Sequence, residues 1–254
     1  MQVYMSDVIE RLEKFAPPDL ASFDYVGLLL GKKTKKIRKI GLTLDFSLLA
    51  MKKAKERGCD ALICHHGPKA FDLPVTGNIA EKIFFSAKNN LPVYRAHLNL
   101  DFCKEGIIET LCNILEIPTK ETILNYRSYK ITNGVRVSNV RLSFNQLLNK
   151  VKKLKPATIR MAGPQRTSFK HIAITSGAGF FEEFMGQLKG VDLYIAGEFE
   201  QEAVKAAEDM GITLLELTHH ASEARPLEII ASRLSKILGV NVDFIETPDS
   251  IRNI

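Results

Sequence analysis

Short apolar runs alternate with amphipathic segments along most of this chain. Two such runs, "KIGLTLDF" at 39–46 and "DALIC" at 60–64, enclose a segment whose apolar residues have helical spacing. The same order recurs between residues 171 and 199. Apolar runs separated by amphipathic helices are typical of parallel strands that are buried on both faces. The pattern therefore predicts an α/β fold.

The two βαβ segments align with each other without a gap. "KIGLTLDFSLLAMKKAKERGCDALICHHG" matches "HIAITSGAGFFEEFMGQLKGVDLYIAGEF" at an offset of 132 residues, the separation of Ile40 from Ile172. "LPVYRAHLNLD" at 91–101 then matches "TLLELTHHASE" at 213–223, at an offset of 122. We therefore predict an internal duplication, with a first half at 1–128 and a second at 129–254. The helix-then-strand pattern near the C-terminus suits either the second half or a return to the first.

Three flanking elements can also be predicted. "SDVIERLEKF" has the spacing of an amphipathic helix, which Pro17-Pro18 would end. Residues 130–142 alternate around Asn133-Gly134 and indicate a β-hairpin. A helix over 143–155 would begin at a serine cap.

The composition is that of a globular protein, with 45% hydrophobic and 25% charged residues. No apolar run reaches membrane-spanning length and the N-terminal segment has no apolar signal core, so we expect a cytoplasmic protein. The four cysteines form no CxxC pair, which argues against a disulfide framework or a zinc ribbon. We expect them to be reduced and buried.

The net charge is +6, and two lysine clusters, 32–39 and 150–155, contribute to it. Such clusters usually form solvated surfaces, but they can also neutralise the phosphates of a nucleic acid. Aromatic residues do not interleave with these lysines, so a stacking platform for single strands is not indicated.

Histidine carries the strongest chemical signal. Five of the six histidines follow just three predicted strands: His65 and His66, then His97, then His219 and His220. The carboxyl ends of strands in an open α/β sheet are where ligands bind. Beyond a strand end the backbone can bend, and Gly67-Pro68 favours a bend that would let both His65 and His66 face the same crevice.

Acidic residues accompany two of these sites. Asp101 follows His97, and Glu223 follows His219, each at a spacing of four residues that shares one face of a helix. Imidazole and carboxylate ligands suit Zn, Mn, Fe, Co or Ni. Two such ions could lower the pKa of a shared water, which points to metal-assisted hydrolysis. His220 would point elsewhere, and His171 begins a strand at the opposite end.

Several motifs resemble those of the Nif-three-like family, whose members are often named GTP cyclohydrolase I type 2 homologs. "FDYVGLLLG" at 23–31 is similar to the family's W-D-N-x-G-L-x-x-G, with Phe23 and Tyr25 departing from it. "HHGPKAF" at 65–71 is similar to H-H-P-x-x-F, and "AHLNLD" at 96–101 to A-H-T-x-x-D. "THHASE" at 218–223 resembles G-H-x-x-[ST]-E, and "SGAG" and "AGE" at 176–179 and 196–198 also match.

The resemblance implies two three-layer α/β/α halves with a dinuclear metal centre in the cleft between them. It also implies a toroidal homohexamer. The metal ligands would be His65, His66, Asp101, His219 and Glu223, with Asp101 and Glu223 as candidate bridges. His97 would lie beside the centre as a catalytic proton shuttle or substrate contact.

Three functional hypotheses follow. The first is a hydrolase that uses two divalent metal ions on C–N bonds of cyclic amidines or amides, a nucleotide being one candidate substrate. The second is a non-catalytic, metal-dependent regulatory or metal-trafficking protein. The third is a nucleic-acid-binding ring whose opening is lined by Lys32 to Lys39.

Overall fold

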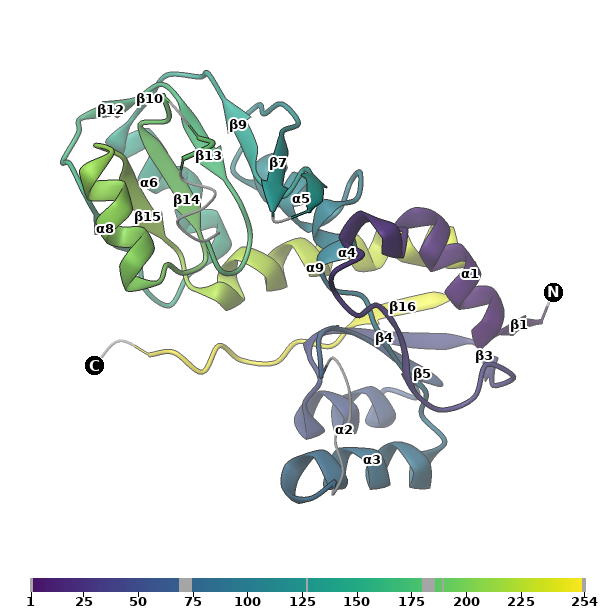
Figure 1. Cartoon of the computed structure of the whole chain (residues 1–254). Coiled ribbons are helices and arrows are strands. Elements are labelled where there is room, and N and C mark those ends of the chain that lie inside the picture. Colours follow the sequence, from purple (N-terminus) through teal and green to yellow (C-terminus); the bar gives the residue numbers. More distant parts are fainter. Residues whose placement is uncertain (1, 69–74, 127, 180–185, 189, 253–254) are drawn as a thin grey trace. The chain divides into compact units, whose positions relative to one another are not determined.

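The computed structural model describes residues 2–252 except 69–74, 127, 180–185 and 189. These residues form a mixed α/β protein with two main mixed sheets (Figure 1). The chain divides into two units. The first contains residues 1–104 and 227–248, and the second contains 105–226 and 249–254.

The first unit is built on a five-stranded sheet. Its strand order is β16 (Asn241–Phe244), β4 (Lys39–Asp45), β5 (Ala61–His66), β6 (Val93–Arg95) and β2 (Gly27–Leu30). The first four strands are parallel, and β2 is antiparallel to β6. The C-terminal strand β16 thus pairs within the first unit's sheet, which answers the question that the sequence left open.

Helices cover both faces of this sheet. Helix α1 (Met5–Phe15) lies on one side, and α2 (Leu48–Glu56) and α3 (Gly77–Asn89) lie on the other (Figure 1). Ala50, Met51 and Ala54 of α2 pack with Leu62 and Cys64 of β5 in one buried apolar cluster. The central strands are buried along nearly their whole length, as expected for parallel strands between helical layers. The predicted N-terminal helix is confirmed and ends just before the two prolines.

The second unit holds the other five-stranded sheet. Its order is β11 (Arg160–Ala162), β15 (Thr213–Glu216), β14 (Leu193–Ala196), β13 (Ile172–Ile174) and β9 (Arg136–Ser138). The three middle strands are parallel and both edge strands are antiparallel. Helix α8 (Gln201–Asp209) buries Ala203 and Ala207 and lies next to β15. The helix predicted between β13 and β14 falls largely on residues outside the described part of the chain.

The two sheets share a strand register. Ile40 pairs with Ala61 in the first unit, and Ile172 pairs with Leu193 in the second. Both residues of the second pair lie 132 positions after those of the first, which is the offset found in the sequence. The two units therefore carry the same parallel strand pairing at equivalent positions.

Smaller elements complete the chain. Three two-stranded sheets pair β1 (Val3–Tyr4) with β3 (Lys36–Ile37), β7 (Ile123–Tyr126) with β8 (Tyr129–Thr132), and β10 (Leu142–Ser143) with β12 (Ser168–Phe169). The remaining helices are η1 (Pro18–Ala21), α4 (Leu98–Phe102), α5 (Ile107–Ile114), α6 (Phe144–Val151), η2 (Lys152–Leu154) and α9 (His219–Leu238). Among the described residues, no helix is long and apolar enough to cross a membrane.

One sequence prediction here was wrong, and another was confirmed. Residues 130–142 do not form a hairpin, because β8 pairs with the preceding β7 while β9 pairs with β13. The distant strand β13 pairs with β9, and β8 forms a local hairpin with β7, so the turn signal at Asn133 does not pair β8 with β9. The serine cap is confirmed, since Ser143 accepts a hydrogen bond from the Gln146 backbone N–H and the Gln146 side chain accepts one from Ser143.

Candidate metal centre

The histidine pair lies within a strand rather than beyond it. His65 and His66 are the last two residues of β5, so the prediction that they follow the strand end was wrong. Their ring centroids are nevertheless only 4.7 Å apart. His65 is fully buried, and the His66 side chain is about one quarter exposed.

Each imidazole of the pair is held through its Nδ1 atom by a neighbouring strand. Nδ1 of His65 donates to the backbone carbonyl of Ala96, at 2.9 Å, directly after β6. Nδ1 of His66 lies 2.9 Å from Oδ1 of Asp45, at the end of β4. A carbonyl oxygen only accepts hydrogen bonds, so Nδ1 of His65 carries a proton and its Nε2 carries a lone pair in the neutral ring. An Nδ1 contact of this kind fixes the tautomer of metal-binding histidines.

Helix α4 adds His97 and Asp101 to the same unit. His97 is the N-cap residue, and its carbonyl accepts a hydrogen bond from the Asp101 N–H, so the segment turns helically. The His97 ring lies 5.0 Å from that of His65 and 5.6 Å from that of His66, between centroids. One ring nitrogen from each of the three histidines lies within 4.8 Å of the others. Burial lowers the pKa of His97 more than its carboxylate neighbours raise it. This group could hold a metal ion.

His65 and Asp101 place two electron-pair donors next to each other. Nε2 of His65 is 3.4 Å from Oδ2 of Asp101, and both side chains are almost fully buried. Lone pairs that face each other in a buried site repel unless a positive charge lies between them. A proton on the imidazole or a metal ion would supply that charge.

The second unit has its own imidazole–carboxylate pair in the first turn of α9. This helix begins at His219, so the spacing of four residues brings Nε2 of His219 to 3.2 Å from Oε2 of Glu223. Nδ1 of His219 lies 2.9 Å from Oε1 of Glu198, which follows β14. The second unit thus repeats the arrangement of the first, with Nδ1 held by an oxygen and Nε2 beside a carboxylate.

Two glycine loops make room for this pair. A Cβ on Gly177 would lie 2.3 Å from Oε1 of Glu223 and 3.1 Å from Nε2 of His219, so a side chain there would occupy the site. The Gly177 N–H donates to Oγ of Ser222, while its carbonyl accepts from the Gly197 N–H. Glycine is therefore required at position 177 by space and also by its positive φ of 59°.

The donor atoms fit a divalent transition metal. They are imidazole nitrogens and carboxylate oxygens, and the four cysteines are buried elsewhere as free thiols, as predicted. Burial raises the pKa of Cys64 to about 12, so its thiol stays protonated within the core. Of the other histidines, His171 contacts the Asn139 side chain at 2.8 Å, and His220 follows His219 in α9.

Comparison with known proteins shows which family the chain belongs to. The model of the family described as Duf34/NIF3 (NGG1p interacting factor 3) matches residues 3–250. The chain belongs to the Duf34/NIF3 family.

Curated relatives in this family match the whole length of the chain. A "GTP cyclohydrolase 1 type 2 homolog" of Clostridium perfringens is 32% identical, with 97% of each chain aligned. A protein of the same name from Methanocaldococcus jannaschii is 31% identical, over 93% of this chain and 96% of that one.

Solved structures agree with the fold. Reduced HcgD from Methanocaldococcus jannaschii is similar, with a TM-score of 0.83, 29% identity, and 97% of this chain and 99% of that chain covered. A Staphylococcus aureus hypothetical protein has a TM-score of 0.81 at 19% identity, over 99% of each chain, which supports the fold alone.

Three acidic residues of this Duf34/NIF3 chain were missed as site residues by sequence reasoning. Asp45 and Glu198 contact His66 and His219, and Asp24 contacts His97 at 2.6 Å. Each had a signal, because Asp45 ends a predicted strand, Glu198 lies in the "AGE" motif and Asp24 lies in "FDYVGLLLG". Motif matching alone did not distinguish these carboxylates from the candidate ligands that they contact.

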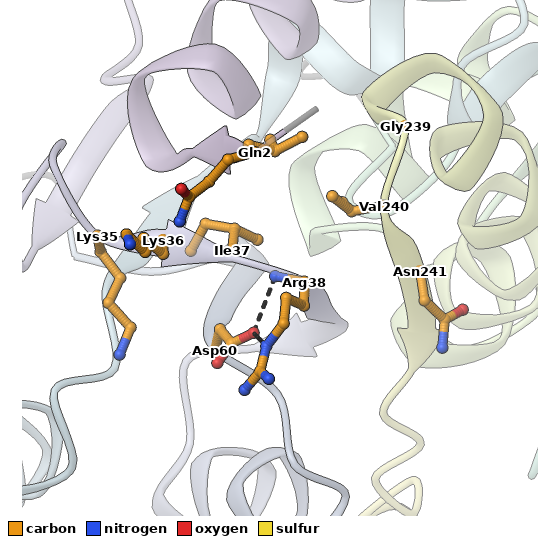
Figure 2. A pocket seen from close by; sticks show the side chains of 10 residues that line it. Gln2, Lys35, Lys36, Ile37, Arg38, Asp60, Gly239, Val240 and Asn241 are labelled. Carbon is orange, nitrogen blue, oxygen red and sulfur yellow. Dashed lines mark hydrogen bonds and ion pairs between the residues drawn. The ribbon is translucent and has the colours of Figure 1, made fainter.

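A separate pocket lies at the opposite end of the first unit's sheet, where β4 and β16 begin. Its volume is about 720 Å³, and Gln2, Lys35, Lys36, Arg38 and Asn241 are among the residues that line it (Figure 2). Asp60 accepts a hydrogen bond from the Arg38 backbone N–H and lies 3.7 Å from its side chain. Among the described residues, Lys35 and Lys36 have no ion pair that would neutralise them.

Proposed function

We propose that this chain binds two divalent metal ions and is a hydrolase for C–N bonds in cyclic amidines or amides. The ligands would be His65, His66, Asp101, His219 and Glu223. The observation that carries the proposal is the common orientation of the histidines: the Nδ1 atoms of His65, His66 and His219 each contact an oxygen, which leaves Nε2 for the metal.

The proposal requires the two ligand sets to act together. The first unit offers His65, His66 and Asp101, and the second offers His219 and Glu223. Two ions of coordination number four to six need more donors than either set holds, and bridging carboxylates reduce that need. We therefore propose a dinuclear centre in a cleft between two α/β/α halves that arose by duplication, with Asp101 and Glu223 as bridging ligands.

A bound pair of ions would supply Lewis acidity and an activated water. The chain's own residues would orient these ligands, with the carboxylates ionised and the imidazoles neutral. His97 would contact the substrate or move a proton, since its ring lies beside both His65 and His66. The name that the curated relatives share, GTP cyclohydrolase 1 type 2 homolog, supports this substrate class, because opening a purine ring hydrolyses C–N bonds of a cyclic amidine.

The first test is metal binding followed by a substrate screen. Calorimetric titration with Zn²⁺ and with Mn²⁺ should give two ions per chain, and Asp101→Asn should lose at least one. Asp209→Asn makes the same chemical change at an exposed position and should bind like the parent protein. The metal-loaded protein is then incubated with nucleotides and cyclic amides. Turnover that Asp101→Asn abolishes supports the hydrolase, whereas metal binding without turnover of any of them favours the regulatory or trafficking alternative.

Nucleic-acid binding is the second candidate function, and the basic pocket of Figure 2 favours it. Lys35 and Lys36 could neutralise phosphates, which makes affinity fall with added salt. Replacing both with Gln should weaken binding to random-sequence DNA. It should also reduce the slope of the logarithm of the binding constant against the logarithm of salt concentration by roughly two. The pair Lys152→Gln and Lys155→Gln removes the same charge from the other lysine cluster and is the control. Equal effects of the two pairs would count against a site at this pocket.

We also propose that the chain assembles with copies of itself, with a hexamer as the expected size. Two large apolar side chains on neighbouring helices of the first unit support self-association: Leu49 of α2 is 47% exposed and Phe84 of α3 is 72% exposed. Light scattering coupled to size exclusion measures the mass directly. Phe84→Ser should shift the mass downward if this face lies in the interface, and an unchanged assembly would place the interface elsewhere.

A further inference from the structure

Three polar side chains of the first unit form a compact network next to the rings of His65 and His66. Asp24 precedes β2, Arg95 ends β6 and His97 caps α4. Nη1 of Arg95 is 3.0 Å from Oδ1 of Asp24, and Nδ1 of His97 is 2.6 Å from Oδ2 of the same carboxylate. The Asp24 and Arg95 side chains are only 2% and 3% exposed. Buried charged groups at this spacing hold each other in fixed positions.

The position of the imidazole proton follows from these contacts. Nη2 of Arg95 is also 2.8 Å from Nδ1 of His97, so Nδ1 has a possible donor and a possible acceptor within reach. It cannot accept from Arg95 and donate to Asp24 at the same time. Burial opposes ionisation of Asp24, but the hydrogen bond from His97 and the charge of Arg95 outweigh it and lower the pKa of Asp24 to about 2. An ionised carboxylate only accepts, so Nδ1 of His97 carries the proton.

The consequence appears on the other side of the ring. In the neutral ring, the single N–H is the one that faces Asp24, 2.6 Å away. Nε2 then carries a lone pair, next to the rings of His65 and His66. Arg95 also donates to the Tyr25 carbonyl, which ties the guanidinium to the loop that contains Asp24.

We propose that Asp24 and Arg95 are positioning residues that lock His97 in its Nδ1–H tautomer. Nε2 of His97 thereby becomes a hydrogen-bond acceptor for an N–H or O–H group of the substrate. The role of the acceptor rests on the proposed function, because a cyclic amidine or amide with a ring N–H offers such a donor. The tautomer itself does not depend on that function.

Asp24→Asn is the decisive variant because Arg95 dictates how the new amide is oriented. The guanidinium is a donor, so it holds the amide oxygen at the Oδ1 position and turns the NH₂ group toward His97. The imidazole must then accept at Nδ1 and move its proton to Nε2. A two-bond ¹⁵N–¹H correlation spectrum of the ¹⁵N-labelled full chain reports which nitrogen is protonated. Asp19→Asn, the same change at an exposed position in η1, is the matched control.

The expected result is an Nδ1–H imidazole for His97 in the parent protein and in Asp19→Asn, and an Nε2–H imidazole in Asp24→Asn. An Nε2–H ring in the parent protein, or an unchanged tautomer in a folded Asp24→Asn, would overturn the proposal. The parent spectrum decides the first point even if the variant does not fold.

Metal titration separates this inference from the proposed function. If His97 is an acceptor and not a ligand, Asp24→Asn and His97→Ala should bind Zn²⁺ with the same stoichiometry as the parent and within about threefold of its affinity. Loss of one ion in His97→Ala would overturn the acceptor role. Absence of metal binding in the parent protein would refute the proposed function and, with it, the acceptor role, while the NMR result would still decide the tautomer.

Discussion

Gly177→Ala gives a sharp test of His219 and Glu223 as the proposed ligands of the second unit. The new methyl group would lie 2.3 Å from Oε1 of Glu223 and 3.1 Å from Nε2 of His219, both of them proposed donor groups. Ordinary carbon–oxygen contacts begin near 3.4 Å, so the carboxylate would have to move by about 1 Å. Ser222 and Gly197 contact the same loop and restrict how far it can shift instead.

Two effects of this substitution have different magnitudes. The positive φ of 59° costs any non-glycine residue about 1–2 kcal/mol of folding free energy, which is about 2–8 °C in Tm for a chain of this size. Displacement of the carboxylate adds a loss of metal affinity. Disturbing groups that orient a ligand weakens metal binding by roughly 10–100-fold, and moving the ligand itself should cost at least that much.

Gly211→Ala isolates the second effect. Gly211 has a φ of 69°, and a Cβ there meets no atom within 4 Å. Both variants should therefore lose similar stability without metal, measured by thermal unfolding in a chelator. Calorimetric titration with Zn²⁺ should show parent-like affinity for Gly211→Ala and a loss of at least tenfold for Gly177→Ala. Equal metal affinities of the two variants would refute the assignment of Glu223 and His219 as ligands.

Three further predictions concern charge, thiols and metal removal. The pKa of Asp24 is about 2 in the folded chain and 3.8 normally, so its ionisation stabilises the fold by about 2 kcal/mol above pH 3.8, and this stabilisation is lost as the pH falls toward 2. Denaturant unfolding should therefore show that Asp24→Asn is less stable than the parent protein at pH 7 and nearly as stable at pH 2. The same loss of stability at both pH values would contradict this prediction. Burial raises the pKa of Cys59 and Cys112 to about 11 and that of Cys64 to about 12. Iodoacetamide at pH 8 should therefore label these thiols only after denaturation, which mass spectrometry would detect. Rapid labelling of the native protein would contradict their burial. Addition of EDTA to metal-loaded protein should remove about 2.7 kcal/mol of stability if the metal was at 100 times its Kd, and an unchanged Tm would argue against a site formed only in the folded chain.

The order of elements was predictable because their signals are local. The apolar run before His65, the proline stop after α1 and the serine cap at Ser143 each depend on neighbours within a few residues. The internal repeat added long-range information, since an offset found in the sequence also relates the strand pairs Ile40–Ala61 and Ile172–Leu193. The repeat therefore predicted that the two copies are equivalent, which hydrophobic periodicity alone does not give.

The errors arose where distant residues decide the local structure. The Asn133-Gly134 signal is compatible with a hairpin, but β9 gains three pairs with β13 and leaves β8 to pair with β7. The histidines stay inside β5 because Asp45 and Ala96 hold their Nδ1 atoms from the two flanking strands. The Asp24–Arg95 ion pair joins residues 71 positions apart, and no periodicity in the sequence relates them.

We propose that two metal ions are bound by ligands from both units, and their positions can be measured directly. Crystals grown with Mn²⁺ and measured at its absorption edge would locate the ions by anomalous scattering. We predict two peaks per chain, about 3.5–4 Å apart, one near His65 and the other near His66 and His219, with the carboxylates of Asp101 and Glu223 near both. Peaks that contact only one of the two units, or no peak at these residues in metal-saturated crystals, would contradict the claim.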